Sequence, residues 1–256
     1  MAITTLDGLL AGMRAPQPFA KVGATTSALG YRAWTPWYSA GVPGASSANT
    51  AGVNGQAVTP ALGVSVAGRI PRDNPSAGLE ARLARFAATV SQPGTLWIVD
   101  RLWQNSGLLA TSISAQAITG ATLPTRDNNG ANLGHGVFAG IEWSTVGGLG
   151  TPTVTLTYTD EAGATGRTAT LAAVSSPTAG TVELFQLAAG DTGTFHLVLF
   201  RQLACLEITT ANIGNSIDAL TGGMPQIFDD SVLQFLWFPA ATTAATFIGQ
   251  TIESHG

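Results

Sequence analysis

The sequence predicts a mainly β protein: an antiparallel β-sandwich or jelly-roll-like domain with an extended N-terminal arm and one amphipathic helix. Several short runs rich in β-branched and aromatic residues are separated by glycine-rich turns, as in sandwiches and barrels. A helical pattern occurs mainly once, so an alternating βαβ array is not expected. Only 10% of the 256 residues are charged and 45% are hydrophobic, whereas about 25% of residues are charged in a typical soluble domain.

The first 70 residues are expected to form the arm. A short helix is predicted at LDGLLAGMRAP, residues 6–16, and residues 15–70 are rich in Gly, Ala, Ser, Thr and Pro with little periodicity. An aromatic cluster in this stretch is unlike a disordered tail. We expect it to be buried on its own domain or on a neighbour, with a carbohydrate platform as the alternative. Its members are Tyr31, Trp34, Trp37 and Tyr38.

The domain proper, residues 71–256, is expected to include the amphipathic helix near residues 75–91. Asn74 is a suitable N-cap, Pro75 suits the first helical position, and QPG at residues 92–94 ends the pattern. Apolar residues at steps of four, three and four would share one helical face. They are Leu79, Leu83, Phe86 and Val90.

Strand patterns follow to the end of the chain. In PTVTLTYTD, residues 152–160, Val154, Leu156 and Tyr158 alternate with threonines and are expected to face inward, and residues 166–174 are expected to return beside them as a hairpin. Further strands are predicted within residues 95–103, 135–146, 180–208, 230–240 and 246–256.

The tip of this hairpin, DEAGATGR, carries both charge signs. A calcium loop needs oxygen ligands at alternating positions, and Ala162 and Ala164 stand at those positions. We therefore expect no ion there. Asp160, Glu161 and Arg167 are instead predicted to pair across the loop or with an adjacent subunit.

The sequence shows no catalytic or metal-binding motif. Its single cysteine and three scattered histidines lack zinc-ligand spacing, and it has no G-x-S-x-G motif. Cys205 is expected to be a small buried side chain. Asp127 and Asn129 are expected to cap backbone groups in a turn, with a weak ion site as the alternative. We expect a non-enzymatic protein without a cofactor.

The net charge of −4 is unevenly distributed. Residues 1–110 carry +4 and residues 111–256 carry −8, which would let one end dock on an acidic partner surface. The chain has no basic cluster and its pI is near 5.2, so no nucleic-acid partner is expected. Its N-terminus lacks the apolar run of a signal peptide or membrane span, so no membrane association is expected.

Four segments together resemble virion structural proteins of tailed bacteriophages. They lie within roughly residues 95–250 and read LWIVDRLWQNSGL, YTDEAGATGRTATL, LFRQLACLEI and ALTGGMPQIFDDSVLQFLWFP. The resemblance supplies no catalytic motif. It implies a β-rich protein of the virion, assembled in the host cytoplasm and present in many copies, whose partners are the major capsid or tail proteins. Composition agrees with a homo-oligomer, and a trimer is the first hypothesis.

These observations favour a capsid decoration or cement subunit that binds the phage shell through protein–protein contacts. The alternative is a tail or fibre-base protein that binds host glycans through Trp34, Trp37 and a β face. A β-sandwich hydrolase is a third hypothesis, without a motif to support it. The candidate interface residues are Arg14, Lys21, Tyr31, Arg32, Trp34, Trp37, Tyr38, Asp160, Glu161 and Arg167.

Overall fold

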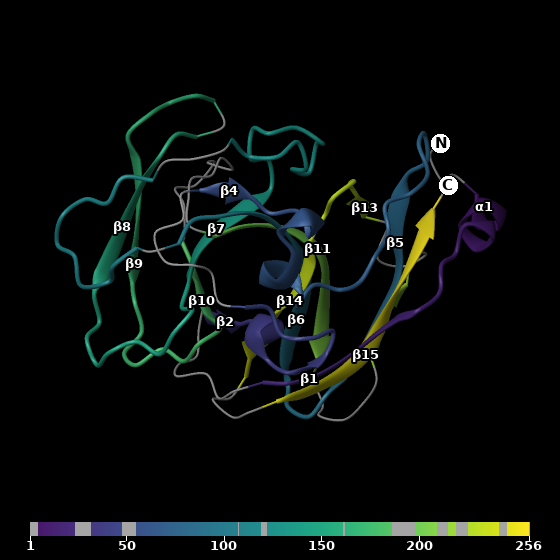
Figure 1. Ribbon diagram of the computed structural model, residues 1–256, viewed down its shortest axis with the longest axis horizontal. Coiled ribbons are helices and arrows are strands. Elements are labelled where there is room, and N and C mark those ends of the chain that lie inside the picture. The colour runs from purple at the N-terminus through teal and green to yellow at the C-terminus, as the bar shows by residue number, and fades with distance from the viewer. Residues whose placement is uncertain are drawn as a thin grey trace.

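The computed structural model confirms a mainly β fold of antiparallel sheets packed together (Figure 1). The α-helix of its described part is α1 (Leu6–Ala11), whose N-terminus is capped where Thr5 Oγ1 accepts a hydrogen bond from the Gly8 amide. The described residues are 5–23, 32–47, 55–106, 108–118, 122–160, 162–185, 198–208, 215–218, 225–240 and 245–255.

The first sheet has the strand order β12-β5-β15-β1-β3, and β13 also pairs with β5. Strand β15 lies between β5 and β1, which brings the C-terminal strand beside both. The bounds of these strands are β1 (Gln17–Val22), β3 (Gly41–Val42), β5 (Ala81–Val90), β12 (Asn215–Asp218), β13 (Gln226–Ile227) and β15 (Thr246–His255).

The second sheet closes on itself. Its order is β11-β7-β10-β2-β14-β6-β4, and β11 pairs with β6 as well, so the strands from β11 to β6 form a ring. Closure leaves these strands without long free edges. Their bounds are β2 (Arg32–Trp34), β4 (Gln56–Ala57), β6 (Gly94–Gln104), β7 (Val137–Glu142), β10 (Thr181–Leu184), β11 (Val198–Ile208) and β14 (Leu233–Pro239).

The predicted hairpin is confirmed as a separate two-stranded sheet of β8 (Thr153–Tyr158) and β9 (Arg167–Ala172). Leu156 and Tyr158 are buried and Val154 is half-buried, as the alternation predicts. In Figure 1 the hairpin lies at the end of the molecule opposite α1 and both chain termini.

The helix predicted near residues 75–91 is wrong: residues 81–90 form β5. Its pairing with β15 shifts register, because Arg85 pairs with Ile252 whereas Leu83 pairs with Glu253. Ala84 is thus an extra residue on β5, as in a β-bulge. The bulge separates the buried Leu83 and Phe86 by a step of three residues, and this spacing imitates a helical face.

The predicted arm, residues 1–70, supplies strands to both sheets. Strand β1 pairs with β15 along its whole length. Strand β2 lies between β10 and β14 in the ring. The described residues of this segment are therefore an integral part of the sandwich and do not extend away from it.

The described residues form four apolar clusters, one of which packs Trp37 against Val58 and Val232. The largest lies between the two sheets, where the rings of Phe19 and Phe235 are 4.2 Å apart. A second, around Val99 and Leu236, lies on the inner face of the ring. Another joins Leu156 and Tyr158 of the hairpin to residues of β6 and β7.

Candidate interaction sites

Two members of the aromatic cluster, Trp34 and Trp37, belong to the core. Trp34 and Trp37 are 2% and 1% exposed. The Trp34 ring stacks on Phe247 at 6.1 Å between centroids, and its Nε1 donates to the Ala179 carbonyl at 3.1 Å. These two indoles therefore offer no free face to a sugar. Tyr31 lies outside the described residues.

Lys21 is also internal, although it was a candidate contact. It is 2% exposed, and its Nζ donates to the carbonyls of Ser39 at 2.8 Å and Gly44 at 3.0 Å. Burial lowers the pKa of its ammonium group to about 8. Because these carbonyls belong to the turn that follows Tyr38, Lys21 fixes this turn against β1.

Arg14 and Arg32 contact other parts of the same chain. Arg14 Nε donates to His255 Nδ1 at 3.1 Å. Arg32 forms an ion pair with the buried Glu183 at 2.9 Å, and its Nη2 donates to the Ala172 carbonyl at 3.2 Å. Arg32 thereby links the ring to the end of β9.

An ion pair lies on the inner face of the ring. Arg101 Nη1 is 2.6 Å from Glu142 Oε2 and its Nε donates to Gln104 at 2.9 Å, while the Tyr38 hydroxyl donates to Glu142. Burial, reinforced by the Glu142 charge, raises the pKa of Tyr38 far above its usual value. Burial lowers the pKa of Arg101, but its interactions with Glu142 and Tyr38 together outweigh burial and the net shift is upward. Arg101 thus stays charged, with Glu142 as its partner.

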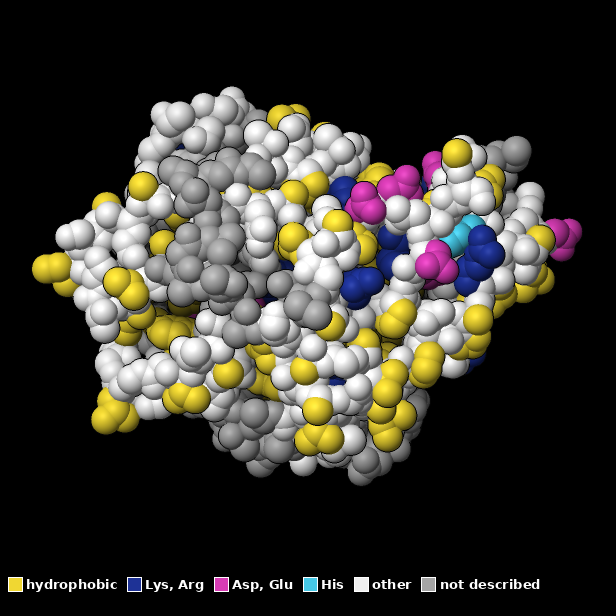
Figure 2. Space-filling model, in the orientation of Figure 1, with side chains coloured by type: hydrophobic (Ala, Val, Ile, Leu, Met, Phe, Trp, Pro, Cys, Tyr) yellow, Lys and Arg dark blue, Asp and Glu magenta, His cyan; other side chains and the backbone are white. Residues whose placement is uncertain are grey.

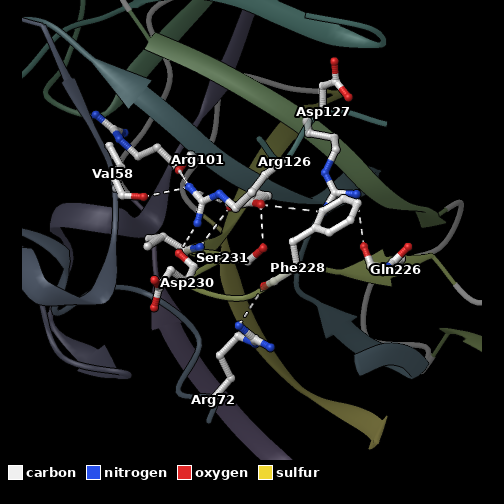
Figure 3. A network of polar contacts seen from close by, with 12 residues as sticks. Val58, Arg72, Arg101, Arg126, Asp127, Gln226, Phe228, Asp230 and Ser231 are labelled. Carbon is white, nitrogen blue, oxygen red and sulfur yellow. Dashed lines mark hydrogen bonds and ion pairs between the residues drawn. The ribbon is translucent and has the colours of Figure 1, made fainter. Parts of the chain in front are cut away.

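A second buried cluster surrounds Asp100, and Figure 3 labels two of its members, Arg126 and Ser231. The Asp100 carboxylate accepts from Ser231 Oγ at 2.7 Å and from the Val232 amide at 2.9 Å. The guanidinium groups of Arg126 and Arg201 lie 3.7 and 3.6 Å from it. Burial lowers the pKa of Arg201, and the Arg126 charge lowers it further. One carboxylate therefore balances two buried cations.

Three arginines bind backbone carbonyls between β13 and β14. Arg201 donates to Gln226 at 3.0 Å and Arg72 to Phe228 at 3.2 Å. Arg126 donates to Asp230 and, at 2.7 Å, to Val58 (Figure 3). Charged donors make strong hydrogen bonds, so this network fixes the segment that leads into β14.

Asp127 has the turn-capping role that the sequence predicts. Its carboxylate is fully buried and accepts hydrogen bonds from backbone amides, the shortest being 2.8 Å from Ala131. Burial raises the pKa of Asp127, but these hydrogen bonds outweigh it and hold the pKa below its usual value. The other amide donors are Asn129, Leu133, Gly134 and His135.

The hairpin tip is closed by its own charges. Arg167 Nε lies 3.0 Å from Asp160 Oδ2, and the Ala164 amide donates to Asp160 Oδ1 at 2.8 Å. The Ala164 amide and the Arg167 charge hold the pKa of Asp160 below its usual value. Pairing across the loop, one of the two predicted arrangements, is thus present. Glu161 lies outside the described residues.

Cys205 corrects a prediction, because it is exposed on β11 rather than buried. Residues along a strand alternate between its two faces, and the neighbours Ala204 and Leu206 pack on the apolar cluster between the sheets. The residues next to Cys205 in the sequence are mostly apolar, and this pattern alone did not show which residues of β11 point inward.

A small pocket of about 260 Å³ lies between β5 and the segment that follows β13. It contains the carboxylates of Glu80 and Asp229 and the guanidinium of Arg126, and no histidine or cysteine lines it. Among the described residues no cluster of three or more His, Cys, Asp or Glu could hold a metal ion. Nor does the described part contain a helix that is long and apolar enough to cross a membrane.

The surface around the hairpin has a different character, and we call it the uncharged lobe. It comprises the described parts of residues 102–125, 143–159 and 168–182, which contain no charged residue. Large apolar side chains project from it. They are Leu109, Ile113, Val146 and Leu149, which are 64%, 104%, 71% and 86% exposed.

The charged residues between these stretches do not alter this character. Arg126, Asp127 and the Glu142 side chain are buried, and Asp160 and Arg167 pair at the tip. Figure 2 shows charged side chains gathered near α1 and the termini, whereas apolar side chains project at the opposite end. Counting charge by short segments would have revealed the lobe from the sequence, whereas comparing two halves of the chain did not.

No family model, curated protein or solved structure matches this chain.

Proposed function

We propose that this chain is a non-enzymatic structural subunit of a tailed-bacteriophage virion that decorates and cements the capsid shell. Its partner in this role is the major capsid protein, and it contacts the shell through the uncharged lobe. The single observation that carries the proposal is the exposure of large apolar side chains on a surface without charge. Such surfaces mark protein–protein contacts when they are not aggregation sites.

The placement of the charged residues supports the same conclusion. Arg14, Lys21 and Arg32 bind other parts of the chain, and the buried arginines of the Asp100 cluster bind carboxylates or backbone carbonyls. These groups hold the sandwich together and are therefore engaged within the chain. The contact element proposed here is therefore the lobe and not residues 1–70.

The test is co-sedimentation of the purified chain with phage capsid shells that lack it. The variant Leu109→Asp/Ile113→Asp places two charges on the lobe, and both positions are exposed, so the fold should be retained. We expect at least about a tenfold loss of affinity, since a desolvated unpaired charge costs more than 1.4 kcal/mol.

The matched control is Val22→Asp, which puts a charge on a 62% exposed apolar residue of β1, outside the lobe. It should bind shells like the wild type. Undiminished binding by the lobe variant would refute the lobe as the contact. Imaging of particles that carry a tagged copy tests the location, and a label on the tail alone would refute the capsid assignment.

A further inference from the structure

The outer edge of β8 is unpaired. Within the described residues β8 pairs with β9 and with no other strand. In an antiparallel pair, alternate residues direct their N–H and C=O groups away from the partner strand. The side of β8 opposite β9 thus presents backbone hydrogen-bonding groups that another strand could satisfy.

Strand β9 is the one tied to the body of the molecule. Arg32 donates to the Ala172 carbonyl, and just beyond β9 the Val174 amide donates to Glu183 at 3.0 Å. No hydrogen bond from another described segment reaches the backbone of residues 153–157. The free edge is therefore that of β8.

This edge lacks the features that usually protect an edge strand. Edges are blunted by charged residues, proline, bulges or very short strands. Elsewhere in this molecule β3 and β4 have two residues each, and β1 contains Pro18. Strand β8 has six residues without charge or proline, and its pairing with β9 has no register shift.

The sequence of β8 is complementary to itself. Thr153, Thr155 and Thr157 are exposed on one face, and Leu156 and Tyr158 are buried on the other. When two such strands pair antiparallel with Thr155 opposite Thr155 or Thr157, threonines face threonines and apolar residues face apolar residues. Two identical uncharged strands meet no like-charge repulsion, which would oppose pairing between charged strands.

We propose that a second copy of this chain pairs antiparallel with the outer edge of β8. The product is a four-stranded sheet, β9-β8-β8-β9, related by a two-fold axis. Such an isologous contact gives a dimer, in place of the trimer expected from composition. Val146 and Leu149 belong to the loop that precedes β8 in the sequence. Both side chains are exposed in the single chain.

This contact goes beyond capsid binding, and it is measured on the isolated chain. Sedimentation velocity over a concentration series gives the dimer dissociation constant. Thr155→Lys places one ammonium group of each copy close to the two-fold axis, directly opposite the other or diagonal to it according to the register, and we expect the constant to rise at least about tenfold. A wild-type chain that stays monomeric at every concentration would overturn the proposal.

The matched control is Thr170→Lys. Thr170 pairs with Thr155 in the hairpin and is exposed on the same face, but it lies one strand farther from the proposed axis. We expect it to dimerise like the wild type. Equal weakening by both substitutions would show a contact through the threonine face and would overturn the pairing through the edge.

Cross-linking provides a second measurement in case the lysine variant is perturbed. In a Cys205→Ser background, the variant Thr155→Cys/Thr157→Cys should form a disulfide-linked dimer on oxidation in either register. Paired residues on adjacent strands have Cβ atoms about 4.5–5.5 Å apart. The control Thr168→Cys/Thr170→Cys should not cross-link. The reverse result, or no cross-link in either variant, contradicts the proposal. Shell binding is scored separately, so either proposal can fail without the other.

Discussion

In the sandwich body several charged side chains are buried, whereas in the uncharged lobe several large apolar side chains are exposed. Arg101 and Asp100 of the body are fully buried, and each contacts a group of opposite charge. In the lobe, Ile113 and Leu149 are almost fully exposed. Ile113 and Leu149 lie in loops between strands, whereas Arg101 and Asp100 lie on β6 within the ring.

The comparison separates the groups that hold the fold from the groups that remain for a partner. A buried ion pair adds little net stability compared with an apolar pair, but removing one member leaves an uncompensated charge and costs several kcal/mol. An exposed apolar side chain contributes little to the fold, since it is in water in both the folded and unfolded states. Substitutions in the two regions should therefore have very different effects.

The largest expected effect is that of Asp100→Asn. This change leaves Arg126 and Arg201 buried without their shared carboxylate, and we expect a loss of about 3–5 kcal/mol in the free energy of unfolding. Urea denaturation measures it. Glu207→Gln, the same chemical change at an exposed position of β11, should alter stability by less than about 0.5 kcal/mol. Equal effects would remove the distinction between buried and surface charge.

Lys21 should make stability depend on pH in the alkaline range. Its pKa is about 8 in the folded chain, against an ordinary value of 10.5, so between these values the unfolded chain binds more protons. The free energy of unfolding should therefore rise with pH across this window, by up to about 3 kcal/mol. Because Lys21 is the only lysine, Lys21→Met should abolish this rise. Parallel pH profiles from urea denaturation of both proteins would contradict the prediction.

In the lobe, Leu149→Gln should have little effect on the fold. Leu149 is 86% exposed, and surface substitutions usually change stability by less than about 0.5 kcal/mol. Thermal and urea unfolding measure this, and shell binding measured on the same sample should fall. A large loss of stability would mean that Leu149 packs against the fold and is not available for a partner.

The smallest expected effect is that of Arg167→Gln at the hairpin tip. The substitution removes the charge beside Asp160 but leaves the Ala164 amide, which is the largest single cause of its lowered pKa. The pKa of Asp160 should rise yet stay below its ordinary value, as an NMR titration of its carboxyl carbon would show. The Asp160–Arg167 pair stabilises the loop at pH values above the ordinary pKa of an aspartate. This stabilisation is lost as the pH falls through the lowered pKa that Asp160 has in the folded chain. A pKa that returns to its ordinary value would assign the whole shift to Arg167.

Local patterns predicted several elements correctly. The alternation in residues 152–160 predicted β8 and the inward residues Leu156 and Tyr158. The short α1 near the N-terminus and the turn around Asp127 also follow from nearby residues. Each of these depends on groups only a few positions apart in the chain, so a single sequence contains the necessary information.

Other features depend on residues that are distant in sequence. Strand β5 has helix-like spacing, yet pairing with β15 through a bulge makes it a strand. The cluster of Asp100, Arg126 and Arg201 joins three separate segments. Backbone hydrogen bonds to a neighbouring strand and burial against a second sheet outweigh local propensity.

The sequence by itself determined the fold class, the hairpin and the scarcity of charge. Tertiary structure alone decided that the two tryptophans of the aromatic cluster, Lys21 and three arginines (Arg101, Arg126 and Arg201) lie inside, and that, among the described residues, an uncharged apolar surface and the edge of β8 remain outside. The physical reason is that hydrophobic burial and strand pairing act between segments far apart in the chain. Whether a side chain is buried or exposed therefore depends on contacts that form only when these distant segments pack together.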